Sequence, residues 1–388
     1  MKPHLRTPPA AATLLALVLA GHAAAQPAPA GAPPPPPPVV SPDIAANGDV
    51  TLRLRAPQAA KVEVVSGGDV PGIPVQGGLP LNKGADGVWQ VTFPKLDSGA
   101  YRYRFNVDGV ATSDPVNPAT SQSNGNAWSL FYVSGAKFMD EQRVAHGAVA
   151  AVHYYSGALA KDRRMHVYLP PGYERSRASY PVFYLLHGAF DGDDSWSTVG
   201  RAGFIIDNLI ASGAAKPMIV VMPDGHTSRF APGGRAGPAS LNMEDFVREF
   251  NADIRPYVEA HYRVLTDRKS TAIAGLSMGG AQTLDIAFGD LSKYAYVGVF
   301  SSGVFDVRSS SQWEDKHRAQ LDDAALKRGL SLVWFSTGKD DFLVDTTVGT
   351  VDLLKKHGFA VTYEQSTGAH TWINWRAYLN KFTPQLFK

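Results

Sequence analysis

Two patterns of hydrophobic and polar positions follow one another along this chain. Over about residues 43–133, short apolar runs alternate with polar positions, most regularly at residues 101–107, just before Asp108-Gly109. A period of two places apolar side chains on one face of a strand, and Asp-Gly is a frequent hairpin turn. The first pattern therefore predicts a small all-β sandwich over residues 43–135.

From residue 146 to residue 388, predicted strands alternate with predicted helices. The clearest helix is expected at residues 243–261, where Phe246, Phe250, Ile254 and Val258 recur at four-residue spacing. Such alternation is typical of βα units and predicts an α/β fold with a mainly parallel sheet. The other expected helices are residues 202–211, 278–288, 346–357 and 372–382, and the expected strands are residues 164–169, 182–186, 218–222, 270–274, 296–300, 332–336 and 359–363.

The first residues have the features of an export signal. Lys2 and Arg6 precede an apolar stretch at residues 11–20, and three alanines end at Ala25. This pattern predicts a secretory signal peptide over residues 1–25 with cleavage near Ala25, and hence a secreted or periplasmic protein. The apolar stretch is shorter than the roughly 20 residues of a membrane span, so no anchor is expected after cleavage. Residues 26–42 are rich in proline and alanine and predict an extended linker.

Composition narrows the chemistry further. The chain of 388 residues has no cysteine, which excludes disulfides, thiolate metal sites and a cysteine nucleophile. Its formal net charge is +2, and charges of both signs are interspersed, so nothing favours nucleic acid or an anionic surface as a partner. A neutral or weakly charged substrate is expected.

Residues 275–280, Gly-Leu-Ser-Met-Gly-Gly, follow a predicted strand and precede a predicted helix. In a nucleophile elbow the serine occupies a sharp strand-to-helix turn, and glycines two positions before and after it keep Cβ atoms away from the neighbouring strand and helix. Gly275 and Gly279 have these positions. Ser277 is therefore the candidate nucleophile.

A serine nucleophile needs an imidazole base and a carboxylate that orients it, and in folds with this elbow the chain order is serine, acid, histidine. Of the histidines after Ser277, His370 lies between the last predicted strand and the final helix, whereas His317 and His357 are expected to be solvated surface residues. For the acid, we favour Asp341 in the segment after the strand at residues 332–336. Asp340 is the alternative, because spacing does not separate adjacent loop residues.

The tetrahedral intermediate of acyl transfer needs two N–H donors for its oxyanion. The backbone N–H of Met278, directly after the serine, is expected to be one. The second is expected from Ala189, because Gly188 permits a turn after the strand at residues 182–186. His187 is interpreted as a structural loop residue. This chemistry requires no metal and no organic cofactor.

With these motifs, residues 146–388 resemble the esterase D family of α/β-hydrolases, and within it the carbohydrate esterase family 1 feruloyl and acetylxylan esterases. The matching pieces are residues 168–173, 185–188, 275–280, 338–343 and 368–372. The resemblance implies an α/β-hydrolase fold with Ser277 as nucleophile, His370 as base, Asp341 as acid and Ala189 and Met278 as oxyanion donors. One departure lies beside the histidine, where Ala369 and Thr371 replace the glycine and aspartate common in the family.

Residues 43–135 resemble an early-set immunoglobulin-like domain related to carbohydrate-binding family 48 modules. The most specific pieces are the strand at residues 101–107 with Asp108-Gly109, and Asp114-Pro115 after it. The resemblance leaves two roles open, which are glycan binding and a packing or substrate-shaping function.

Together these features predict a secreted serine esterase that removes feruloyl or acetyl groups from a plant cell-wall polysaccharide such as xylan, so that its partner is an acylated polysaccharide or oligosaccharide. The alternatives are a siderophore esterase of the enterochelin type, an acyltransferase of the mycolyl type and a non-catalytic glycan-binding protein. For Trp196, core packing is weighed equally against a place in the pocket. Residues expected to contact substrate are Phe190, Trp196, His226 and Trp372, with Phe230 and Phe342 as further rim aromatics.

Overall fold

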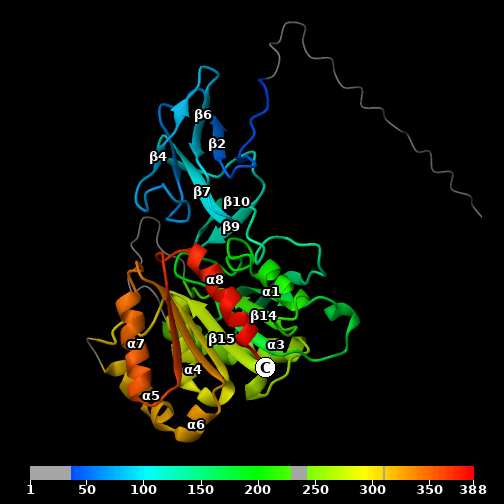
Figure 1. The fold of residues 1–388 in the computed structure, drawn as a ribbon, viewed down its shortest axis with the longest axis vertical. Helices are drawn as coiled ribbons and strands as arrows, with labels where there is room; N and C mark the ends of the chain where they lie inside the picture. The colour runs from blue at the N-terminus through cyan, green and yellow to red at the C-terminus, as the bar shows by residue number, and fades with distance from the viewer. Residues whose placement is uncertain (1–35, 229–242, 309–310) are drawn as a thin grey trace, which may run out of the picture. The chain divides into compact units, whose positions relative to one another are not determined.

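The computed structural model describes residues 36–228, 243–308 and 311–388, and its compact part begins at Val39 (Figure 1). The expected signal peptide and Phe230 lie outside the described residues. Within them, every helix is too short or too polar to cross a lipid bilayer.

Residues 43–133 form two antiparallel sheets around one apolar core. Their alternating strands bury one face each, with Leu52 and Leu54 from one sheet and Tyr103 and Phe105 from the other in the same cluster. The all-β prediction is confirmed at this level, and the immunoglobulin-like topology stays a prediction. One sheet has the order β1(Asp43–Ile44), β2(Val50–Arg55), β6(Val88–Phe93), β5(Asn82–Lys83), and the other β4(Leu79–Pro80), β3(Val62–Val65), β7(Gly99–Val107), β10(Asn126–Val133), β9(Thr120–Ser123), with β8(Val110–Thr112) beside β7.

The second part is built on one eight-stranded sheet. Its central parallel strands are buried and rich in Val, Ile, Leu and Phe, as expected where helices cover both faces. The prediction of a mainly parallel sheet is confirmed, because within this sheet the strand at residues 161–169 alone runs antiparallel to both of its neighbours. The strand order is β11(Ala148–Ser156), β12(Lys161–Leu169), β14(Ile219–Pro223), β13(Val182–Leu186), β15(Thr271–Leu276), β16(Tyr296–Phe300), β17(Leu332–Gly338), β18(Val361–Ser366).

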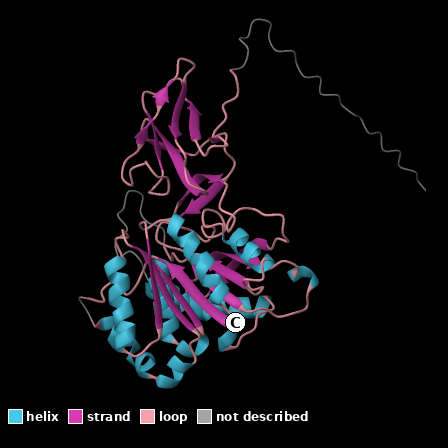
Figure 2. Cartoon of the chain, in the orientation of Figure 1, coloured by secondary structure: helices cyan, strands magenta, loops and turns pink. Residues whose placement is uncertain are grey.

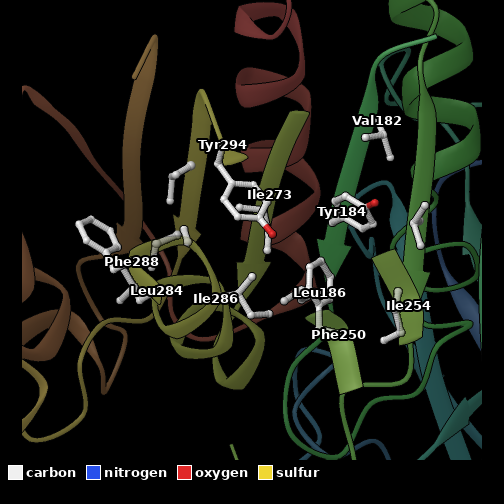
Figure 3. Close-up of a cluster of buried hydrophobic side chains, with 14 of the residues drawn as sticks. Val182, Tyr184, Leu186, Phe250, Ile254, Ile273, Leu284, Ile286, Phe288 and Tyr294 are labelled. Atoms are coloured by element: carbon white, nitrogen blue, oxygen red, sulfur yellow. The ribbon is translucent and has the colours of Figure 1, made fainter. Parts of the chain in front are cut away.

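Helices pack on both faces of this sheet (Figure 2). One face buries Phe183 and Trp334 against α1(Ala202–Ala211) and α8(Trp372–Phe382). On the other face, Tyr184 of β13 meets Phe250 with ring centroids 4.9 Å apart, and Figure 3 shows this apolar layer. This second face is covered by α4(Met278–Gly289), α5(Gln312–Asp322), α7(Val344–Lys356) and the helical residues 243–261, with α6(Ala324–Arg328) after α5.

Several elements differ from the sequence prediction, and strand β11 and the helical residues 243–261 are the most informative of them. Strand β11 was not predicted, because it is an edge strand whose mostly exposed side chains lack an apolar alternation. The single helix expected at residues 243–261 is instead α2(Met243–Glu249), a π-helical turn Phe250–Ile254 and α3(Arg255–His261). Pro256 cannot donate a helical hydrogen bond, and the wider turn lies just before it. The predicted apolar face is nevertheless fully buried.

A buried ionic network fixes this helical segment to the sheet. Glu249 is fully buried and accepts hydrogen bonds from Arg163 Nε at 2.8 Å and from Tyr154 Oη at 2.8 Å. Arg163 also donates to the carbonyl oxygens of Asp224 and His226, at 2.6 and 2.7 Å. One side chain of β12 therefore holds both the π-helical segment and the loop that follows β14.

The Glu249→Leu variant is expected to lose about 3–5 kcal/mol of unfolding free energy, because it leaves the buried Arg163 guanidinium without its nearer carboxylate partner, with only Asp224 Oδ2 remaining at 3.5 Å. Urea denaturation followed by circular dichroism measures this change. Glu244→Leu, on the same helix with its side chain 85% exposed, is the matched control and is expected to change stability by about 0.5 kcal/mol or less. Equal stabilities of the two variants would contradict the assigned role of the network.

Candidate active site

Ser277 lies in a strained turn between β15 and α4. Its backbone angles are φ 50° and ψ −119°, a combination that L residues rarely adopt. The Ser277 N–H donates to the Phe300 carbonyl oxygen at 2.9 Å, and the Ser277 carbonyl oxygen accepts from Ser302 Oγ at 2.5 Å. The next strand, β16, and its following loop therefore hold the strained residue from both sides.

The glycines of the elbow have no room for a side chain. A Cβ on Gly275 would lie 2.3 Å from the backbone of Gly279, and a Cβ on Gly279 would lie 2.5 Å from the carbonyl oxygen of His187. Both distances are well inside van der Waals contact with backbone atoms, which have little freedom to move. The expectation that these glycines clear the neighbouring strand and helix is confirmed.

The structure brings Ser277, His370 and Asp341 together from three separate loops. Ser277 Oγ lies 2.9 Å from His370 Nε2, and His370 Nδ1 lies 3.0 Å from each carboxylate oxygen of Asp341. With Nδ1 donating to Asp341, Nε2 accepts from the serine hydroxyl. Asp340 is exposed, whereas the Asp341 side chain is fully buried.

The electrostatic surroundings keep Asp341 ionised. Burial alone would raise the pKa of its carboxyl, but the hydrogen bond and charge of His370 and the Leu343 N–H lower the pKa below its ordinary value. The Leu343 N–H donates to Asp341 Oδ1 at 2.9 Å. A buried, ionised carboxylate in this position orients the imidazole and stabilises its positive charge.

The loop at residues 187–191 lies directly against the elbow. A Cβ on Gly188 would lie 3.2 Å from Ser277 Cβ, so the next residue, Ala189, follows immediately beside the serine. Met278 is the first residue of α4, and the first N–H groups of a helix have no intrahelical acceptor. The positions of Ala189 and Met278 agree with the two N–H donors that the sequence predicts. The role of these N–H groups in binding an oxyanion stays a prediction.

Histidines His187 and His226 lie beside each other, with ring centroids 5.4 Å apart. His187 is buried, with Nδ1 2.8 Å from the Gly188 carbonyl oxygen and Nε2 accepting from the Gly225 N–H at 2.8 Å. These bonds tie together the loops after β13 and β14, in agreement with a structural role. Burial lowers the pKa of His226 to about 3, so its ring is uncharged near neutral pH.

The expectation that His317 and His357 are solvated is wrong. The His317 side chain is 4% exposed, and its Nδ1 lies 2.8 Å from the Trp313 carbonyl oxygen. The His357 side chain is 8% exposed and lies between the carboxylates of Glu314 and Asp322, at 2.9 and 3.0 Å. Both rings pack α5 against its neighbours, which an isolated charged helix pattern does not indicate.

A buried ion pair connects the antiparallel sheets to the loop at residues 187–191. Arg102 of β7 donates from Nε to Asp69 at 2.6 Å and from Nη1 to Asp191 at 2.7 Å. The three side chains are 12%, 9% and 4% exposed. Asp191 Oδ2 lies 3.3 Å from the position of a Cβ on Gly188. The loop is therefore held at one end by Arg102 and touches Ser277 at the other.

The residues expected to contact substrate fall into two groups. Trp196 and Trp372 are each 1% exposed and pack edge to face with ring centroids 5.0 Å apart. This burial agrees with the alternative of core packing for Trp196. Trp372 lies in the same core. Phe190, by contrast, is 57% exposed and has a positive φ of 67°. Phe342 is 74% exposed, and its ring centroid is 4.4 Å from that of His370.

Two features of the site were not found in the sequence. Phe305, 38% exposed, follows β16 and lies on the loop of Ser302, and an apolar residue just after a parallel strand is the signal that could have indicated it. The pairing of Arg102 with Asp191 joins residues 89 positions apart, and no local pattern reports it. Among the described residues, no cluster of three or more His, Asp or Glu side chains could hold a metal ion.

The lowered pKa of Asp341 predicts a pH-dependent contribution to stability. A carboxylate whose pKa is held below 3.8 in the folded protein stabilises the fold above that pH, and this contribution is lost as the pH falls through the lowered pKa. We expect wild type to be more stable than Asp341→Asn near neutral pH, with the difference shrinking below about pH 4. Urea denaturation at several pH values measures it. For the exposed neighbour, Asp340→Asn, a comparable pH-dependent difference would contradict the assignment.

Comparisons with known proteins show the family of this chain. The esterase family model, described as "Putative esterase", matches residues 156–386. An endo-1,4-beta-xylanase/feruloyl esterase of Xylanibacter ruminicola is 30% identical over 358 residues, which cover 89% of this chain and 46% of that protein. The chain spans less than half the length of the first curated relatives that it matches.

Solved structures show the same fold. A ferulic acid esterase of Anaeromyces mucronatus in complex with ferulic acid has a TM-score of 0.56 and 26% identity, covering 66% of this chain and 96% of that one. An enterochelin esterase of Shigella flexneri has a TM-score of 0.61 and 16% identity, covering 88% and 92%, a likeness of fold alone. Since the family match spans more than half of the chain, this protein has the α/β-hydrolase fold and belongs to that esterase family.

Proposed function

We propose that this protein is a serine carboxylesterase that removes feruloyl or acetyl groups from a plant cell-wall polysaccharide such as xylan. The observation that carries the proposal is the 2.9 Å contact between Ser277 Oγ and His370 Nε2, with Asp341 behind the imidazole. The proposal includes export through residues 1–25, a linker over residues 26–42, and domains over residues 43–135 and 146–388.

In the proposed reaction, His370 Nε2 takes the proton of the Ser277 hydroxyl as the oxygen attacks the ester carbonyl carbon. Asp341 stabilises the resulting imidazolium, and the Ala189 and Met278 N–H groups bind the oxyanion. The imidazolium then gives its proton to the leaving alcohol, which leaves an acyl group on Ser277. A water molecule deprotonated by His370 releases the acid and restores the serine.

The exposed aromatic residues favour an aromatic acyl group. Phe190, Phe305 and Phe342 are exposed on the loops that follow β13, β16 and β17, and parallel strands direct these loops to one edge of the sheet. Exposed phenylalanines stand next to the nucleophile and the base, where a planar cinnamoyl ring could pack against them. This arrangement supports feruloyl over acetyl, as do the names of the relatives that the chain resembles.

Siderophore ester hydrolysis is the second candidate function. Its support is the fold of the enterochelin esterase, which covers more of this chain than the ferulic acid esterase does, including antiparallel strands ahead of the hydrolase. A fold shared at 16% identity does not transfer a substrate. Enterochelin is therefore assayed beside methyl ferulate, and a higher kcat/KM for enterochelin would favour the siderophore function.

Replacement of the nucleophile is the first test. We expect Ser277→Ala to lower kcat/KM for methyl ferulate by about 10⁴-fold or more, because the residual rate then comes from binding and oxyanion stabilisation alone. A fluorophosphonate probe is expected to label wild type at Ser277 and to leave the variant unlabelled. Ser212→Ala, an exposed serine after α1, is the control. Full esterase activity in Ser277→Ala would reject the mechanism.

The acyl preference is tested at Phe342. Because stacking on an exposed ring contributes about 0.5–1.5 kcal/mol, Phe342→Ala is expected to lower the ratio of kcat/KM for methyl ferulate to that for 4-nitrophenyl acetate by about 3- to 10-fold. The ratio cancels any effect of the substitution on His370, which both substrates need. Val75→Ala, equally exposed at 74%, is the control. An unchanged ratio in Phe342→Ala would favour a short acyl group.

A further inference from the structure

A polar pocket lies beside the proposed catalytic residues. It has a volume of about 430 Å³ and is lined by His153 and by residues 122–125, 161–164, 191–193, 224 and 226–228. None of the exposed phenylalanines and none of Ser277, His370 and Asp341 contributes to its lining. This volume is within the range of small-molecule sites, although such sites are usually lined by apolar side chains.

The pocket shares one loop with the nucleophile. Asp191 lines the pocket, and three residues earlier Gly188 lies against Ser277. A segment of three residues spans at most roughly 11 Å, which limits the distance between pocket and serine. On the other side, a Cβ on Gly225 would lie 3.1 Å from Met278 Cε, and Gly225 adjoins the lining residue His226. A substrate held at Ser277 therefore has the pocket within reach.

The pocket has one more anionic than cationic side chain, and most of its charges are already paired. Arg164 donates to both carboxylate oxygens of Asp193, at 2.7 and 2.6 Å, and His166 Nδ1 lies 2.8 Å from the same carboxylate. Burial would raise the pKa of Asp193, but these partners lower it well below its ordinary value, so the pair stays ionised. The lining holds three cationic and four anionic side chains, which are Lys161, Arg163, Arg164, Asp162, Asp191, Asp193 and Asp224.

Such a wall suits a neutral ligand that is rich in hydroxyl groups. Paired charges give little net attraction for a phosphate or a cation, whereas fixed donors and acceptors of both kinds match hydroxyl groups, which both donate and accept. His153 and Asp162 line the pocket as well, and among the described residues neither side chain has a hydrogen-bond partner. Both remain available to a ligand.

The antiparallel part of the fold supplies one side of this pocket. Residues 122–125 comprise the end of β9 and the turn to β10, and the Gln122 N–H donates to Asp194 Oδ2 at 2.8 Å. Arg164 donates to the Gln122 side chain, and Asn124 Nδ2 donates to the Ser228 carbonyl oxygen at 3.3 Å. The hairpin is therefore fastened to the loops of the hydrolase, and the pocket is incomplete without it.

We propose that this pocket binds a neutral sugar unit on the alcohol side of the ester, while the exposed phenylalanines contact the acyl group. This inference rests on the proposed esterase function and specifies its substrate. It also assigns the antiparallel part a substrate-shaping role, because its hairpin completes a site next to Ser277. Sugar recognition then depends on hydrogen bonding, since no Phe, Tyr or Trp side chain lines the pocket among the described residues.

The experiment compares kcat/KM for two esters of the same acid, methyl ferulate and a feruloyl ester of a neutral pentose trisaccharide. We expect wild type to prefer the trisaccharide ester. His153→Ala is expected to lower that preference by about 3- to 10-fold, the effect of one or two lost hydrogen bonds. Ser123→Trp, which places a large ring in the pocket from the hairpin, is expected to lower it further. His261→Ala, an exposed histidine on α3 outside the pocket, is the matched control.

The outcomes separate this inference from the proposed function. Cleavage of both esters with the same preference in wild type, His153→Ala and Ser123→Trp would overturn the sugar pocket and leave the esterase intact. A wild type that cleaves neither of these esters nor 4-nitrophenyl acetate would reject the proposed function itself. A third substrate, the same ester on a trisaccharide with a uronic acid unit, tests whether the pocket prefers a neutral or a negatively charged sugar. A strong preference for the uronic acid ester would overturn the assignment of a neutral ligand.

Discussion

The strained backbone of Ser277 is the constraint on which the rest of this structure depends. A φ of 50° at a serine persists only where the surroundings hold it. Here β16 and the loop that follows it each hold it through one hydrogen bond, and the glycines on either side let strand, helix and neighbouring loop approach within distances that exclude any side chain. The central position of β15 in the sheet makes this possible, because rigid strands flank it on both sides.

Around this fixed point the loops divide into an apolar and a polar side. The loops after β16 and β17 present Phe305 and Phe342, whereas the loop after β14 lines the pocket with hydrogen-bonding groups. The loop after β13 belongs to both sides, since Phe190 is exposed and the next residue, Asp191, lines the pocket. An ester whose acid is aromatic and whose alcohol is a sugar has the same division across its scissile bond.

Local signals in the sequence predicted the candidate catalytic residues better than they predicted the packing around those residues. The elbow glycines and the loop of His370 could be predicted because their reasons are steric and lie within a few residues. The burial of Trp196 and Trp372 could not, since it depends on side chains from distant strands and helices. The π-helical turn before Pro256 leaves the apolar spacing unchanged, so periodicity did not reveal it. Strand β11 lacked the alternation that marks a buried strand, because it is at the edge.

The ion pair of Arg102 with Asp191 has a consequence for how such a chain can evolve. Joining of independent modules by gene fusion leaves each half stable alone, with few bonds across the junction. Here the hydrolase half would be left with a buried aspartate that lacks its counter-charge, on the very loop that touches the nucleophile. Recombination between the halves would therefore have to exchange both charged residues together. We expect Arg102 and Asp191 to be inherited as a pair.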